Sequence, residues 1–341
     1  MHKEPAIAFA SKGYHILLEK PMAVTEKDCK EVIAATKQAG VMLCVCHVLR
    51  YSPATIKIKE LLNAGAIGDV VHIQHLEPVG FEHFAHSFVR GNWRNEKESA
   101  FSLLCKSCHD IDLINYWMDD KRCLKVSSFG SLSHFTKDDK PAGASDRCLD
   151  CMVEESCPYS AKKIYLEPAQ RGVTGWPLSV ICPDSQVTVG AITEALRSGP
   201  YGRCVYQCDN DVVTNQVVNM EFEEGATAAL TMIAFSQKVC VRKTTIYGTK
   251  GELHCEGTGP VNVFDFHTKE VREYGASITR CHSRYLQSHG GADLYLIHTF
   301  CRAVALEDPS LISTGPDVSL DSHLLVFAAE RARLEAKVIF L

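Results

Sequence analysis

Residues 14–47 decide the fold, and they read YHILLEKPMAVTEKDCKEVIAATKQAGVMLCVCH. Residues 14–18 form a short apolar run, which is typical of a buried strand. Thr25 is a good N-cap, and apolar residues follow it at helical spacing until Gly40 stops the helix. Residues 41–45 form a second apolar run. The order strand, helix, strand predicts a βαβ unit whose parallel sheet is buried on both faces.

The segment before this unit, residues 6–13, looks like the end of a helix closed by Gly13. Two strands cannot make a stable sheet of this type, so its open edge needs more strands. A doubly wound domain would supply them before Met1. We therefore expect residues 1–47 to be the remnant of a Rossmann-like domain that lacks its front half, and residues 48–341 to be a second domain.

The second domain is expected to be α+β. Its later part alternates strand patterns with Gly-containing turns, which favours an open, mostly antiparallel sheet. Between the two parts lies a loop insertion, residues 134–185, that is rich in Pro, Gly, Cys and Asp. The expected helices are 52–65, 107–118, 292–306 and 319–337, and the expected strands are 70–77, 126–133, 212–222, 226–235, 244–247 and 261–266. The fold class is thus α/β followed by α+β.

Composition excludes several kinds of partner. The formal net charge is -5, and no dense basic patch is present, which argues against nucleic acid. No apolar run has the length of a signal peptide or of a membrane-spanning helix. Of the 341 residues, 16 are Cys, which is below the density of a disulfide scaffold. We expect a cytoplasmic chain with reduced thiols and no membrane partner.

Six short motifs follow one another with a regular order and spacing. They are Glu19-Lys20-Pro21, His47 with Arg50, Tyr51 and Pro53, the turn Ala64-Gly65-Ala66-Ile67-Gly68, Trp93-Arg94, His109-Asp110-Ile111-Asp112, and His289-Gly290-Gly291 with Asp293. Together they resemble the Gfo/Idh/MocA (glucose-fructose oxidoreductase/inositol dehydrogenase) family, from about Ala6 to the end of the chain. The resemblance implies an NAD(P)-dependent oxidoreductase that transfers hydride to or from a sugar, inositol or related polyol. It also implies homo-oligomers that pack through the C-terminal sheet.

Lys20 and His109 are the catalytic residues that the resemblance implies. Pro21 forces an extended backbone at Lys20, so the Lys projects from the carboxyl end of a parallel strand, where ligands bind in open α/β sheets. There it would position and polarise a substrate hydroxyl. His109 has an imidazole suited to take the hydroxyl proton while hydride leaves the same carbon.

Further site residues follow from the same resemblance. Many family members carry an Asp four residues before the catalytic His, whereas this chain has Cys105 there, followed by Lys106. A neutral thiol cannot act as a carboxylate would, so Lys106 is a candidate substitute. The cofactor-binding candidates are Glu19, Lys20, Pro21, Arg50, Trp93 and Arg94, and the substrate-binding candidates are Lys106, Tyr206, His289 and Asp293.

The dinucleotide fingerprint is missing from the sequence. A pyrophosphate site needs a Gly-rich turn between a strand and a helix. The only Gly-x-Gly is Gly257-Thr258-Gly259, in the strand-rich part, where it reads as a turn. We therefore expect no NAD(P) binding in the family manner. The chain could be a fragment or alternative product of an enzyme, an incomplete gene model, or a catalytically inactive relative that serves as a ligand- or protein-binding module.

A cysteine cluster lies in the inserted loop. Cys148, Cys151 and Cys157 have the spacing C-x2-C-x5-C, and Cys-x-x-Cys is a common half-site for zinc or an iron–sulfur cluster. Cys182 or a nearby His could complete the ligand set. The alternative is a group of free thiols or a redox-sensitive pair.

Overall fold

The fold begins with a small α/β unit. The computed structural model describes residues 2–183, 186–275 and 288–341. The unit runs α1 (Lys3–Ala10), β1 (Ile16–Leu18), α2 (Glu26–Gln38) and β2 (Leu43–Val45). β1 and β2 pair in parallel, and the Thr25 hydroxyl accepts a hydrogen bond from the backbone N–H of Asp28 at 3.1 Å, which caps α2. The predicted βαβ unit is confirmed.

The second part is built on one large sheet. In the described residues it has nine strands in the order β10-β9-β8-β7-β3-β6-β5-β4-β11, and only β3 and β6 pair in parallel. The predicted open, mostly antiparallel sheet is therefore confirmed. The strands are β3 (Val70–Pro78), β4 (Cys123–Ser131), β5 (Asn215–Phe222), β6 (Thr227–Ile233), β7 (Lys243–Gly248), β8 (Gly251–Glu256), β9 (Val261–Asp265), β10 (Val271–Tyr274) and β11 (Ile339–Phe340).

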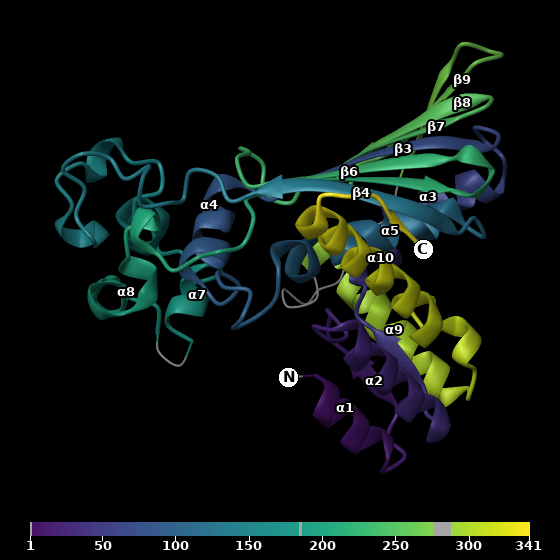
Figure 1. The fold of residues 1–341 in the computed structure, drawn as a ribbon, viewed down its shortest axis with the longest axis horizontal. Coiled ribbons are helices and arrows are strands. Elements are labelled where there is room, and N and C mark those ends of the chain that lie inside the picture. Colours follow the sequence, from purple (N-terminus) through teal and green to yellow (C-terminus); the bar gives the residue numbers. More distant parts are fainter. Residues whose placement is uncertain (1, 184–185, 276–287) are drawn as a thin grey trace.

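Helices cover one face of this sheet. Figure 1 shows α5 (Cys108–Met118) and α10 (Pro316–Glu335) beneath it, with α3 (Pro53–Asn63) and α9 (Ala292–Ala305) nearby. Alternate residues of each strand face these helices, so Ile73 and Leu230 are fully buried. α10 also packs Leu320 and Phe327 on the apolar core of the first unit. This long helix thus connects the two parts of the molecule.

An irregular lobe interrupts the sheet between β4 and β5. Residues 132–214 form it, with the helices α6 (Glu167–Gln170), α7 (Leu178–Ile181) and α8 (Val189–Ser198). It lies beside α4 (Phe81–Phe84), on the left of Figure 1. The predicted loop insertion of residues 134–185 falls inside this lobe, which continues beyond it. Within the described ranges, no helix combines the length and apolar character needed to cross a bilayer.

Seven of the helices and strands named above were not predicted from the sequence, namely α4, α6, α7, α8, β8, β10 and β11. β8 alternates but begins with Gly, while β10 and β11 are edge strands with little apolar patterning. α8 contains Gly and β-branched residues, which weaken the helical signal, and it is stabilised instead by the Thr188 cap. Pairing and packing with distant segments therefore decide these elements.

Candidate functional site

Lys20 lies directly beyond the carboxyl end of β1. Its ammonium donates a hydrogen bond to the backbone carbonyl of Cys105 at 3.0 Å. Cys105 belongs to the turn Leu103–Ser107 that leads into α5. The hydrogen bond therefore connects the first unit to the helix that carries His109. The position of Lys20 agrees with the expectation that it projects from the edge where ligands bind in such sheets.

Three histidines from three elements meet next to Lys20. The ring of His47, which follows β2, is 5.7 Å from that of His109 in α5 and 5.3 Å from that of His323 in α10. His323 accepts from the Met22 N–H at Nε2 and donates from Nδ1 to the Ser319 carbonyl. In contrast, both ring nitrogens of His47 and Nδ1 of His109 are buried and have no hydrogen-bond partner among the described residues. Such atoms are costly to bury, which makes this a candidate ligand site.

His289 and Asp293 close the group from the other side. The His289 ring lies 6.4 Å from the His109 ring, and its Nδ1 is 3.1 Å from a carboxylate oxygen of Asp293. His289 is in the Ser288–Gly291 turn before α9, with a φ of 50°. The structure thus brings Lys20, His109, His289 and Asp293 together from three segments of the chain.

Burial controls the charge of the histidines. The pKa of His109 is well below 6.5, first because of burial and then because of the nearby Lys20 charge. Burial likewise lowers the pKa of His47 to about 3, although Asp112 opposes the shift. His109 is therefore an uncharged imidazole at neutral pH, the form that accepts a proton. Burial also raises the pKa of the Cys105 thiol to about 11, so it cannot supply the missing carboxylate.

We expect folding stability to fall as the pH drops from 6.5 towards 3, partly through His47. The unfolded chain binds a proton at His47 near pH 6.5, whereas the folded chain does not until about pH 3. Folding therefore loses up to about 1.4 kcal/mol per pH unit from this residue in that window. Urea unfolding of the wild type and of His47→Asn at pH 7, 6 and 5 measures it. Equal pH slopes in the two proteins would contradict the assignment.

Arg50 supports the site from within the protein. Its guanidinium donates two hydrogen bonds to Asp112, at 2.6 and 2.8 Å, and a third to the Ser313 carbonyl. Asp112 also accepts from Ser322 at 2.6 Å. Arg50 is only 4% exposed. These contacts give no support to the expectation that Arg50 binds cofactor, because its donors are used in a buried ion pair.

Lys106 belongs to a second buried group beside the site. Its ammonium is 2.9 Å from the Cys240 thiol and 3.5 Å from the Glu77 carboxylate. Arg242 is 3.2 Å from Glu77 and 2.5 Å from Asp110, and Asp110 also contacts His75 at 3.0 Å. The negative charges of Glu77 and Asp110 are therefore balanced by the positive charges of Lys106 and Arg242. His75, Cys240, Arg242 and His289 line a cavity of about 260 Å³, which makes this group a neighbour of the candidate site.

Sequence reasoning missed Glu77, His75 and Arg242. Two of them carry a signal, because Ile73, His75 and Glu77 occupy alternate positions of β3 and so face the same side. Polar residues in register with a buried apolar one indicate a polar group inside the protein. Arg242 precedes β7 in a segment without a clear pattern, and only the fold brings it to Glu77.

Three other candidates lie elsewhere. The Trp93 ring is 44% exposed and stacks on Phe88. Arg94 pairs with Asp209 at 2.9 Å. Tyr206 lies in the irregular lobe, where its hydroxyl is 3.0 Å from His134. Tyr206 lines another cavity, so its position gives no support to a role as polyol ligand. The contacts of Trp93 and Arg94 likewise give no support to a cofactor role.

The cysteine loop does not contain a formed metal centre. Among the residues that the structure describes, no three His, Cys, Asp or Glu side chains converge as a bound metal would require. Cys148, Cys151 and Cys157 do line one cavity, but Cys182 does not, and Cys204 lines it instead. The structure therefore gives no support to Cys182 as a fourth ligand.

The residues at the carboxyl ends of β1 and β2 fit one end of a nicotinamide cofactor. The unpartnered nitrogens of His47 and His109, together with the Lys20 ammonium, offer polar groups to a hydroxyl and to the nicotinamide end. The Gly-rich turn for a pyrophosphate does not occur in residues 1–341.

Comparison with known proteins agrees with this arrangement. Residues 1–47 match the model of the GFO_IDH_MocA oxidoreductase family, described as an NAD-binding Rossmann fold. YteT of Bacillus subtilis (strain 168) is 25% identical over 291 residues, which are 83% of this chain and 65% of YteT. A 1,5-anhydro-D-fructose reductase of Ensifer adhaerens is 31% identical over 127 residues, 35% of each protein.

The fold has the same kind of relatives among solved structures. A levoglucosan dehydrogenase in complex with NADH and levoglucosan superposes with a TM-score of 0.66 at 15% identity, and the match covers 100% of this chain and 77% of that one. This likeness concerns the fold alone. The chain spans about two-thirds of YteT, at 65%, and about one-third of the reductase, at 35%.

Proposed function

Because the chain belongs to the Gfo/Idh/MocA family of oxidoreductases, we propose that it contributes the catalytic centre for hydride transfer between NAD(P) and a hydroxyl-bearing carbon of a sugar, inositol or related polyol. The observation that carries the proposal is the meeting of Lys20, His109 and His289 beyond the carboxyl ends of two parallel strands. Relatives whose names state a sugar-derived substrate support the substrate class.

His109 acts as the base in this proposal. Its imidazole is uncharged, and its Nδ1 has no protein partner, so the ring is free to take a proton from a substrate hydroxyl. Lys20 positions that hydroxyl and stabilises the negative charge that develops on its oxygen. His289, oriented by Asp293, binds a neighbouring hydroxyl. Bound NAD(P) supplies the hydride acceptor.

A titration with NADH and NADPH tests the proposal on the purified chain. Although the sequence lacks the Gly-rich turn with which the family binds the pyrophosphate, we expect a saturable change in cofactor fluorescence and a rise in melting temperature, because Lys20 and its neighbours would contact the nicotinamide end. Lys20→Met should weaken binding, whereas Lys12→Met, an exposed Lys of the same unit, should not.

A failure to bind either nucleotide would contradict the proposal. If the wild type shows neither a fluorescence change nor a thermal shift with either nucleotide, the chain does not catalyse hydride transfer by itself. It would then be a module that binds a ligand or a protein without catalysis. The choice between NAD and NADP is measured in the same titration.

Assembly and location remain predictions of this proposal. The strand positions that point away from the helices include the exposed rings of Phe129, at 68%, and Tyr247, at 40%. A sheet face with such side chains is suited to pack on a second copy, as the family resemblance implies. A cytoplasmic location suits a chain with many free thiols.

A further inference from the structure

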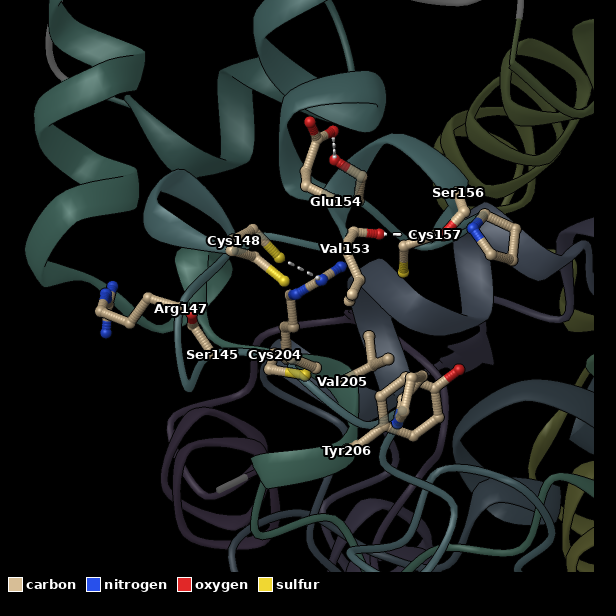
Figure 2. Close-up of a pocket in the computed structure, with 16 residues that line it drawn as sticks. Ser145, Arg147, Cys148, Val153, Glu154, Ser156, Cys157, Cys204, Val205 and Tyr206 are labelled. Carbon is tan, nitrogen blue, oxygen red and sulfur yellow. Dashed lines mark hydrogen bonds between the residues drawn. The ribbon is translucent and has the colours of Figure 1, made fainter.

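Four thiols line one small cavity in the irregular lobe. Cys148, Cys151, Cys157 and Cys204 surround a space of about 100 Å³, which Figure 2 shows in close-up. The first three come from the Cys-rich loop, and Cys204 comes from a segment about fifty residues later that returns to the same place. The fold, rather than the sequence spacing, therefore brings the fourth thiol into the group.

Arg90 is the most informative residue of the cavity wall. Its side chain is completely buried, and in the described part of the chain no carboxylate lies within 4.0 Å of it. It donates to the carbonyls of Arg203 at 2.7 Å and Tyr159 at 2.8 Å and to the Cys148 sulfur at 3.4 Å, while Nη1 has no partner. A buried cation without a counter-charge is costly. A negatively charged group next to Arg90 would therefore lower the free-energy cost of burying its guanidinium.

A second cation lines the same cavity. Arg147 donates to the carbonyls of Leu196 at 2.7 Å and Gly199 at 2.5 Å, its Nε is buried without a partner, and it too has no carboxylate partner among the described residues. Glu154 is the acid of the cavity wall, and Lys162 lies 3.5 Å from it and balances it. Two positive charges, those of Arg90 and Arg147, thus remain uncompensated.

We propose that Cys148, Cys151, Cys157 and Cys204 bind one Zn²⁺ as four thiolates, with the buried Arg90 and the partly buried Arg147 as the counter-charge. Four thiolates and one Zn²⁺ have a net charge of minus two, which the two guanidinium groups neutralise. Binding releases four thiol protons to solvent and changes no oxidation state. Because the sulfurs do not converge in the described residues, they must close around the ion.

The proposed zinc has a structural role. The lobe of residues 132–214 has few regular elements, and a four-thiolate site stabilises such a segment by cross-linking distant residues. A tetrahedral zinc site needs less space than an iron–sulfur cluster, which agrees with a cavity of about 100 Å³. The site lies in the lobe, outside the group formed by Lys20 and His109.

Metal analysis of the purified full chain tests the proposal. After expression with both zinc and iron supplied, mass spectrometry should find about one zinc per chain in the wild type. Cys157→Ser and Cys204→Ser should lose most of it, while the matched control Cys182→Ser, a buried thiol of the same lobe outside the cavity, should keep it. Less than about a tenth of a zinc per wild-type chain, or stoichiometric iron with visible absorption, overturns the proposal.

A second measurement uses the wild type alone, so its result does not depend on whether the Cys variants fold. Replacement of zinc by Co²⁺ in the wild type should give the absorption bands of a tetrahedral thiolate site, and a mercurial that blocks thiols should release the metal as measured with a colorimetric zinc indicator. Octahedral cobalt spectra, or metal that dialysis against EDTA removes without changing the melting temperature, would show adventitious binding and overturn the proposal.

Discussion

Replacing Asp112 by Ala is expected to lower the free energy of unfolding by about 3–5 kcal/mol. Asp112 is completely buried and neutralises Arg50 through two hydrogen bonds. Its removal leaves the Arg50 charge in the protein interior without a carboxylate, with the Ser313 carbonyl and the Tyr116 ring as its remaining contacts, and the Ser322 hydroxyl loses its carboxylate acceptor. Urea unfolding followed by circular dichroism measures the change.

The matched control is an exposed ion pair. Arg122 and Glu223 form such a pair at the surface, where the Arg122 side chain is 81% exposed, so Arg122→Met should leave the unfolding midpoint unchanged. The double variant Arg50→Met with Asp112→Leu should recover part of the lost stability, because no buried charge is left unpaired. An Asp112→Ala protein as stable as the wild type would show that this pair does not hold the turn Val48–Tyr51, α5 and α10 together.

His109→Asn is expected to reduce kcat about 10²–10⁴-fold in NAD(P)-dependent oxidation of a polyol. Asn has a similar size and can hydrogen bond, but it cannot take a proton at neutral pH. The fall in kcat should exceed any rise in KM, because the proton transfer occurs in the transition state. Steady-state kinetics of cofactor reduction across pH provide the measurement.

His72→Asn is the control for this variant. His72 lies on the opposite side of β3, where it contacts Thr227 at 2.9 Å, and it should retain wild-type kcat. If His109→Asn keeps both kcat and the pH profile of the wild type, His109 is not the base, and Lys106 becomes the alternative proton acceptor.

The first unit could be predicted because its signals are local. The capped helix after Thr25 and the apolar runs on either side of it need no distant partner to be recognised. The Glu-Lys-Pro segment then places Lys20 at the end of β1. Local sequence also indicated His109 at the start of α5 and the turn that holds His289.

The parts that could not be predicted depend on contacts between distant residues. Arg50 and Asp112 are 62 positions apart, and Arg242 and Asp110 are 132 apart, so no local pattern reveals either pair. Tyr206 was assigned to the polyol pocket by its residue type alone, whereas the fold places it near His134. Cys204 was similarly hidden, because its neighbours in sequence give no sign of the Cys-rich loop that it meets.

Deuterium transfer tests the central claim most directly. The purified chain is incubated with NAD⁺ or NADP⁺ and polyols deuterated at carbon, such as perdeuterated myo-inositol and [1-²H]glucose, and the reduced cofactor is analysed by mass spectrometry. The arrangement of Lys20 and His109 predicts that deuterium appears in the reduced cofactor and that His109→Asn nearly abolishes its appearance. A wild-type protein that transfers no deuterium from any of these polyols to either cofactor would contradict the proposed function.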